Sequence, residues 1–93
     1  MVYGNLQAPC AYEGMKDAFT QKIQNAFGVA LRKHRHALGI SQEELADRAG
    51  ITPVYVSLLE TGRRVPTIVV VFALARGLGL SAGEFVTEIE TGV

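Results

Sequence analysis

The sequence predicts an all-α fold of five helices. Three observations support this prediction: apolar residues recur with helical spacing, signals for helix starts follow one another, and no stretch alternates polar and apolar residues over a strand's length. The 93 residues have room for one hydrophobic core and no second domain. We expect residues 1–22 to form a partly helical N-terminal arm and residues 23–93 to form the folded domain.

The first predicted helix begins near Lys16 and ends at Gly39. Its apolar stripe consists of Phe19, Ile23, Phe27, Leu31 and Leu38. Basic residues and histidines near its end suit the negative end of the helix dipole. Gly28 lies inside the pattern, so the stretch forms either one helix or two.

The second and third helices have clear start and stop signals. Ser41 followed by Glu44 is a capping box, and that helix is expected to end at Gly50. Thr52 then caps a helix whose first position is Pro53, where the missing N–H costs nothing. This third helix is expected to stop at residue 62.

Two further helices follow. Pro66 and Thr67 open a fourth helix over residues 68–78, which glycine closes at position 79. Ser81 and Glu84 repeat the capping box and start a fifth helix.

The second and third helices together form a helix-turn-helix at about residues 41–61. Ala46 and Ala49 are small, so the two helices can approach closely and cross steeply. In such a unit the second helix stands out from the body of the protein, where it can enter the major groove of DNA.

Charge and composition restrict the possible functions. Nine basic residues balance nine acidic ones, but residues 27–66 carry six basic residues against four acidic ones. This uneven distribution permits nucleic-acid binding. No apolar run is long enough to cross a bilayer, no secretion signal is visible, and Cys10 is the single cysteine. We therefore expect a cytoplasmic protein without a membrane association.

Residues 27–85 resemble the Cro- and phage-repressor-type (XRE) helix-turn-helix proteins. The segments that carry this resemblance are SQEELA at 41–46, GIT at 50–52, LETGRRVP at 59–66 and ARGLGLS at 75–81, with Arg35 before them. Each segment is a weak signal, but their common order and spacing are specific. The resemblance implies a five-helix lambda-repressor-like bundle that binds operator DNA as a homodimer and regulates transcription.

The resemblance also implies roles for individual residues. Five positions match those that contact DNA phosphates: Ser41, Gln42, Thr52, Arg63 and Arg64. Helix N-termini are suited to such contacts because their free N–H groups attract anions. Arg35 and Glu60 match a pair that forms an internal salt bridge between the first and third helices.

The positions expected to contact bases are Pro53, Val54, Tyr55, Ser57 and Leu58. Direct recognition of bases depends mainly on Arg, Lys, Asn and Gln, and none of these stands here. Recognition of DNA shape or contacts from the basic loop could contribute instead. The alternative is a protein-interaction module, or an antitoxin-like autoregulator with weak base recognition and a toxin or another protein as partner.

The fourth helix is apolar on every side and must be covered, either by the N-terminal segment or by a second subunit. We expect a homodimer whose interface contains Val69, Val70, Ala73, Phe85 and Ile89. The sequence contains no glycine-rich phosphate loop, no nucleophile with its base and no cluster of metal ligands, since His34 and His36 lie on different helix faces. We therefore expect no enzymatic activity, cofactor or metal.

Overall fold

The computed structural model describes residues 18–93, which form five helices. These are α1 (Ala18–Ala37), α2 (Gln42–Ala49), α3 (Pro53–Glu60), α4 (Ile68–Gly77) and α5 (Ala82–Thr91). No strand occurs among these residues, and the predicted all-α, five-helix fold is confirmed. The expectations for the arm before residue 18 and for Cys10 lie outside the described residues.

Hydroxyl side chains begin four of the helices. Ser41, Thr52, Thr67 and Ser81 each accept a hydrogen bond from the backbone N–H three residues later. The capping box is complete only at Ser81, where Glu84 also accepts from the Ser81 N–H. At Ser41 the predicted reciprocal bond is absent, because the Glu44 carboxylate accepts from Arg48 at 3.2 Å instead.

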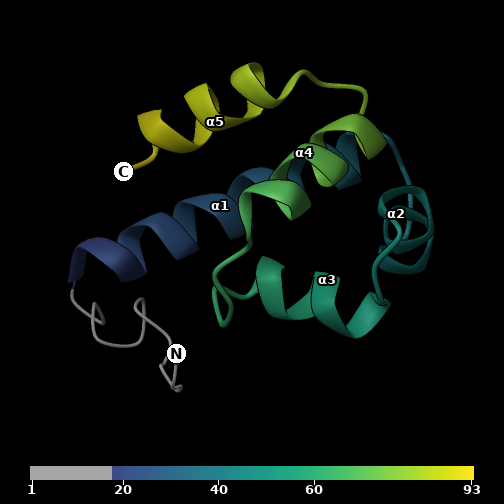
Figure 1. The fold of residues 1–93 in the computed structure, drawn as a ribbon, viewed down its shortest axis with the longest axis horizontal. Coiled ribbons are helices and arrows are strands. Elements are labelled where there is room, and N and C mark those ends of the chain that lie inside the picture. Colours follow the sequence, from purple (N-terminus) through teal and green to yellow (C-terminus); the bar gives the residue numbers. More distant parts are fainter. Residues whose placement is uncertain (1–17) are drawn as a thin grey trace, which may run out of the picture.

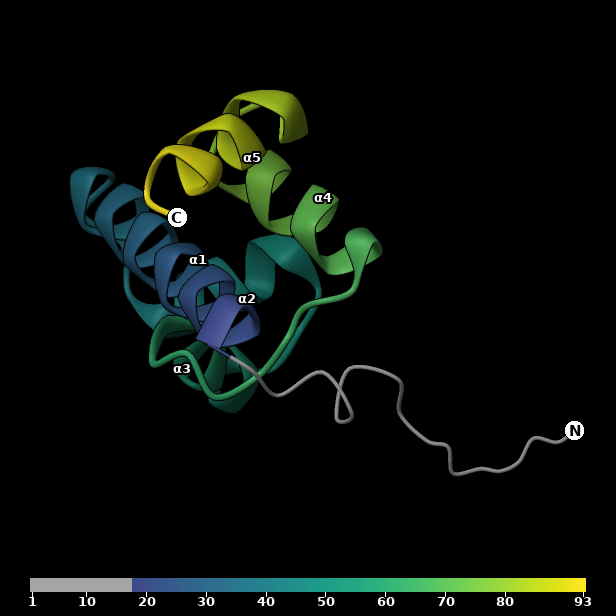
Figure 2. The same cartoon turned by 90° about the vertical axis from the view of Figure 1, so that its left-hand side faces the viewer.

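Helix α1 is a single helix of 20 residues and forms the base on which α3 and α5 pack. Figures 1 and 2 show α3 and α5 on opposite sides of α1. Helix α4 packs against α2 and α5. Gly28 does not interrupt α1. It lies where α1 meets the end of α3, and an added Cβ would lie 2.6 Å from the Glu60 carbonyl oxygen. A side chain at this position would therefore push the two helices apart.

The core lies between the five helices. Its largest fully buried side chains are Leu31, Leu45, Val56, Leu59, Leu74 and Phe85. Phe27 joins them, with its ring centroid 5.5 Å from that of Phe85. Because helices from both halves of the chain contribute, this core fixes the position of α2 and α3 relative to the rest.

The predicted apolar stripe of α1 is only partly buried. Phe27 and Leu31 are in the core, but Phe19, Ile23 and Leu38 are exposed. Leu38 follows the last residue of α1, while Phe19 and Ile23 lie in its first turns, ahead of the core.

No single helix within residues 18–93 combines the length and apolar character needed to cross a membrane. Helices α4 and α5 together reach that length and composition, with a bend of 105° between them.

Candidate DNA-binding site

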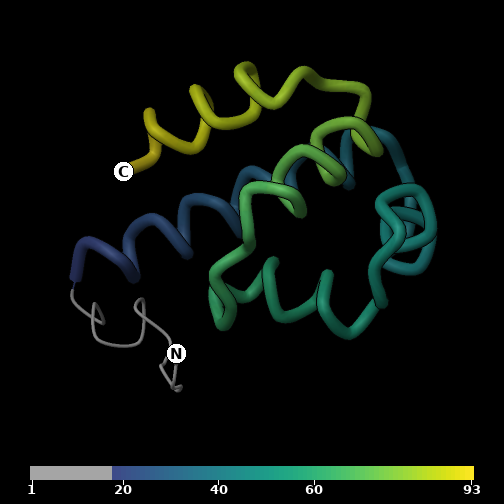
Figure 3. Tube along the Cα trace, in the orientation of Figure 1, coloured from purple at the N-terminus to yellow at the C-terminus, as the bar shows by residue number. Residues whose placement is uncertain are grey.

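Helices α2 and α3 form a compact unit at one end of the molecule. The trace in Figure 3 turns sharply between them, and the Gly50 N–H ends α2 by donating to the Ala46 and Asp47 carbonyls. Leu45 and Ala46 of α2 are buried together with Val56 of α3. The unit is thus held by its own apolar contacts as well as by the core.

The outer face of α3 combines exposed and half-buried residues. Thr52 and Pro53 are exposed, and Val54 is 70% exposed. Tyr55 packs partly against the core, and Ser57 and Leu58 are half-buried. Among the positions expected to contact bases, the start of α3 is therefore the most accessible.

The loop after α3 presents Arg63 and Arg64, which are both exposed. Gly62, directly before them, is buried, and its carbonyl accepts two side-chain hydrogen bonds from α1. Gln24 donates its amide N–H to the Gly62 carbonyl at 3.1 Å, and Gln21 donates to the same oxygen at 3.3 Å. The basic loop is thus anchored to the first turns of α1.

A buried ionic network joins α1, α2 and α3. The Arg35 Nε and Nη2 donate to the two Glu60 carboxylate oxygens at 2.6 and 3.1 Å, and the Gln42 amide donates to Glu60 Oε1 at 3.0 Å. The Arg35 Nη1 also donates to the Ile40 carbonyl at 3.0 Å. The side chains of Arg35 and Glu60 are only 11% and 3% exposed.

Charge and hydrogen bonding keep this network ionised. Burial acts to raise the pKa of Glu60, but the hydrogen bonds from Arg35 and Gln42 and the positive charge of Arg35 lower the pKa overall. The hydrogen bond to Glu60 raises the pKa of Arg35. Glu60 therefore remains a carboxylate that fixes the end of α3 to the two preceding helices.

Ser41 and Gln42 lie at the start of α2. Ser41 is exposed, and its hydroxyl caps the helix. Gln42 is half-buried, and its side-chain amide donates a hydrogen bond to the Glu60 carboxylate. An amide NH₂ has two N–H donors, so a second donor remains for an anion.

Apart from the expected pair of Arg35 and Glu60, the contacts between α1 and distant parts of the chain were not predicted from the sequence. Besides the two glutamines, Lys33 and His34 both contact Glu88 of α5, at 3.2 and 2.6 Å. The hydrogen bonds from His34 and Lys33 lower the pKa of Glu88. No sequence signal indicates these contacts, because the partners lie 38–55 positions apart.

The residues expected at a dimer interface occupy two different environments. Val69 is exposed, and Val70 and Ala73 are half-buried. Phe85 is 0% exposed, and Ile89 is buried against α1. The expectation is wrong for Phe85 and Ile89, because their side chains fill the core of their own subunit.

Exposed apolar side chains on α4 instead surround Val69. Ile68 and Phe72 are exposed beside it, and a shallow groove is lined by Val69, Phe72, Ala73, Arg76, Leu80 and Ala82. Within residues 18–93, this part of the apolar surface of α4 is therefore uncovered.

Comparison with known proteins identifies the unit. Residues 26–92 match the family model for the helix-turn-helix domain. An HTH-type transcriptional regulator of Sinorhizobium fredii, y4dJ, is 45% identical over 68 residues, which are 73% of this chain and 88% of the relative.

Solved structures of two regulatory proteins are similar to this chain. The clp gene regulator ClgR of Corynebacterium glutamicum is similar with a TM-score of 0.70 and 30% identity, over 74% of this chain and 73% of that one. The restriction-modification controller protein C.AhdI of Aeromonas hydrophila is similar with a TM-score of 0.65 and 37% identity, over 67% and 94% of the two chains.

Proposed function

Because this chain belongs to the helix-turn-helix domain family and is a DNA-binding transcriptional regulator of the XRE type, we propose a specific mode of binding. In this proposal the protein binds a palindromic operator as a homodimer. The observation that carries the proposal is the exposed start of α3, together with two exposed arginines in the loop that follows the end of α3 and that α1 anchors. This arrangement brings an accessible helix and a positive charge to one side of the molecule.

In the proposed complex, the start of α3 enters the major groove. Pro53 and Val54 approach the base edges first, followed by Tyr55, Ser57 and Leu58. Val54 and Leu58 can only pack against thymine methyl groups, whereas Tyr55 and Ser57 can form hydrogen bonds.

Contacts to the DNA backbone surround this helix. Arg63 and Arg64 supply the charge, and the capped starts of α2 and α3 supply Ser41, Gln42 and Thr52. We expect these contacts to fix the orientation of α3 and to contribute affinity that does not depend on sequence.

The uncovered face of α4 supports the homodimer. Ile68, Val69 and Phe72 are all exposed, with Val70 and Ala73 beside them. Clustered exposed apolar side chains commonly mark an interface. A two-fold dimer would present two copies of α3, so the two half-sites should lie about one helical turn of DNA, or a multiple of it, apart.

The test is a titration of the protein against a randomised DNA pool at two salt concentrations, followed by sequencing of the bound fraction. We expect enrichment of a palindromic site and affinity that falls steeply with salt. The variant Arg63→Ala/Arg64→Ala should weaken binding to all sequences alike, whereas Tyr55→Ala or Ser57→Ala should change the preference among sequences. Salt-sensitive binding without enrichment would contradict sequence-specific recognition.

A protein-interaction module is the second candidate, with a toxin or another protein as partner. The exposed Val54 on the outer face of α3 and the zero net charge favour it. A folded protein that binds no DNA in the same titration would support this candidate over the first.

A further inference from the structure

The first two turns of α1 lie outside the region that matches the family. The match begins at residue 26, whereas α1 begins at Ala18. These turns carry three amide side chains, Gln21, Gln24 and Asn25, of which Gln21 donates to Asn25 Oδ1 at 2.8 Å. The core residues begin only at Phe27, so the amides lie ahead of the core.

These amides converge on Gly62. One carbonyl oxygen accepts from both Gln21 and Gln24, which uses both of its lone pairs. Gly62 has a φ of +73°, and an added Cβ would lie 2.6 Å from Asn25 Oδ1. The positive φ favours glycine at this position, and a Cβ would also require the Asn25 side chain to move. The next two residues along the chain are Arg63 and Arg64.

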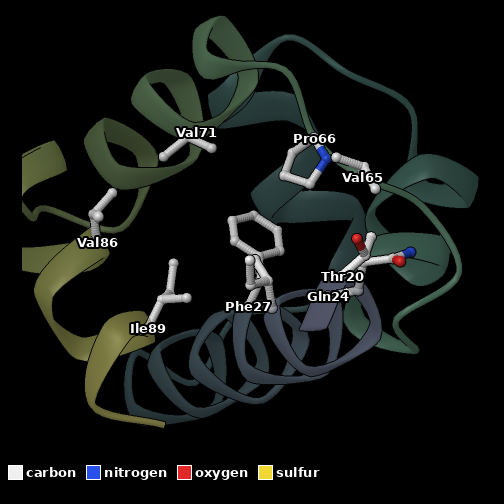
Figure 4. A pocket seen from close by; sticks show the side chains of 9 residues that line it. Thr20, Gln24, Phe27, Val65, Pro66, Val71, Val86 and Ile89 are labelled. Carbon is white, nitrogen blue, oxygen red and sulfur yellow. The ribbon is translucent and has the colours of Figure 1, made fainter. Parts of the chain in front are cut away.

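The remainder of the loop also lies against α1. In Figure 4, Thr20 and Gln24 lie near Val65 and Pro66, at one end of a cavity of about 330 Å³. The loop is thus held on α1 at Gly62 and borders a shared cavity at Val65 and Pro66. The two arginines lie between these points and stay exposed.

We propose that Gln21 and Gln24 are positioning residues that hold the loop at residues 61–66 so that Arg63 and Arg64 meet DNA phosphates. This inference rests on the proposed DNA-binding function. A loop that is already ordered loses less conformational entropy on binding, so its arginines contribute more to affinity. The two glutamines would act through the loop and need not touch the DNA.

The experiment compares Gln21→Ala/Gln24→Ala with the wild type and with Thr87→Val. Alanine is the best helix former, so the double variant should keep α1 intact. Thr87→Val is the matched control, because it also removes a neutral hydrogen bond to a backbone carbonyl, at Gly83 in α5. Each protein is analysed by ¹⁵N NMR relaxation and by DNA titration over a series of salt concentrations.

In the free protein, we expect the backbone order parameters of Arg63 and Arg64 to fall from about 0.85 to below about 0.6 in the double glutamine variant. Values that stay at the wild-type level would overturn the inference. This measurement does not require DNA, so it tests the anchoring of the loop even if the protein binds no DNA. A lack of DNA binding would separately contradict the proposed function.

In the titration, we expect the glutamine variant to bind about tenfold more weakly. Its plot of log affinity against log salt should be shallower by about 0.9 for each phosphate that the arginines no longer neutralise. Adding Arg63→Ala/Arg64→Ala should reduce DNA affinity by a smaller factor in the glutamine variant than in the wild type, because the arginines of the glutamine variant are no longer positioned. Equal costs in both backgrounds would overturn the inference. Thr87→Val should match the wild type in every measurement.

Discussion

Substitution of Glu60 by alanine tests the buried ionic network that joins α1, α2 and α3. Glu60→Ala removes the acceptor of two hydrogen bonds from Arg35 and one from Gln42. The Arg35 guanidinium would keep its contacts with the Ile40 carbonyl and the His36 ring, in a side chain only 11% exposed. The cost is therefore that of a buried charge left without its counter-ion.

Removal of one partner from a buried pair costs about 3–5 kcal/mol, and the remaining hydrogen bond to Ile40 places this case near the lower end, at about 3 kcal/mol. For a domain of this size, that destabilisation corresponds to a fall in Tm of about 12–24 °C. Because small domains are stable by only about 5–15 kcal/mol, the variant should be markedly less stable but still folded at low temperature.

The assay is thermal unfolding followed by circular dichroism at pH 7, with urea unfolding as a second measure. The control is Glu44→Ala, which also deprives an arginine, Arg48, of its carboxylate. The Glu44 side chain is 51% exposed, so we expect a change below about 0.5 kcal/mol. The double variant Arg35→Met/Glu60→Met should recover most of the stability, because neither charge is then stranded. A Glu60→Ala protein as stable as the Glu44→Ala control would refute this account.

Acid titration, helix packing and subunit assembly can be tested in the same way. The pKa of Glu60 is lowered on folding, so its ionised form stabilises the fold above the ordinary carboxyl pKa of about 4.3. This contribution is lost as pH falls through the lowered value. Urea titrations from pH 7 to 3 should therefore show the stability difference between wild type and Glu60→Gln shrinking only below about pH 4. Gly28→Ala should lower Tm despite a gain of about 1 kcal/mol in helix propensity, because its Cβ would meet the Leu59 and Glu60 carbonyls at 2.8 and 2.6 Å; a stabilised variant would contradict the close approach of α1 and α3. Phe72→Glu should shift sedimentation from dimer to monomer while leaving Tm nearly unchanged, because the side chain is 60% exposed; an unshifted dimer would exclude this face as the interface.

Much of the fold could be predicted because helix boundaries depend on local chemistry. Ser41, Thr52, Thr67 and Ser81 each fix a helix start with a hydrogen bond only three residues away. The position of the Glu44 carboxylate shows the limit of such patterns, since Arg48 one turn later competes for it.

Contacts between distant segments could not be predicted in the same way. Phe85 and Ile89 were expected at a dimer interface, whereas the fold buries both in the core of a single chain. Their apolar character is the same in either case, so the sequence does not distinguish the two environments. The amides of Gln21 and Gln24 look like solvated surface residues until the fold brings Gly62 to them.

Different segments of α1 contact the core and the loop that carries Arg63 and Arg64. Residues from Phe27 onward contribute to the core, whereas Gln21 and Gln24 form hydrogen bonds to the loop that carries the arginines. Under the proposed anchoring of the loop, substitutions in the first turns of the helix would change the affinity for DNA through the order of that loop. Substitutions from Phe27 onward would instead change the packing of the core.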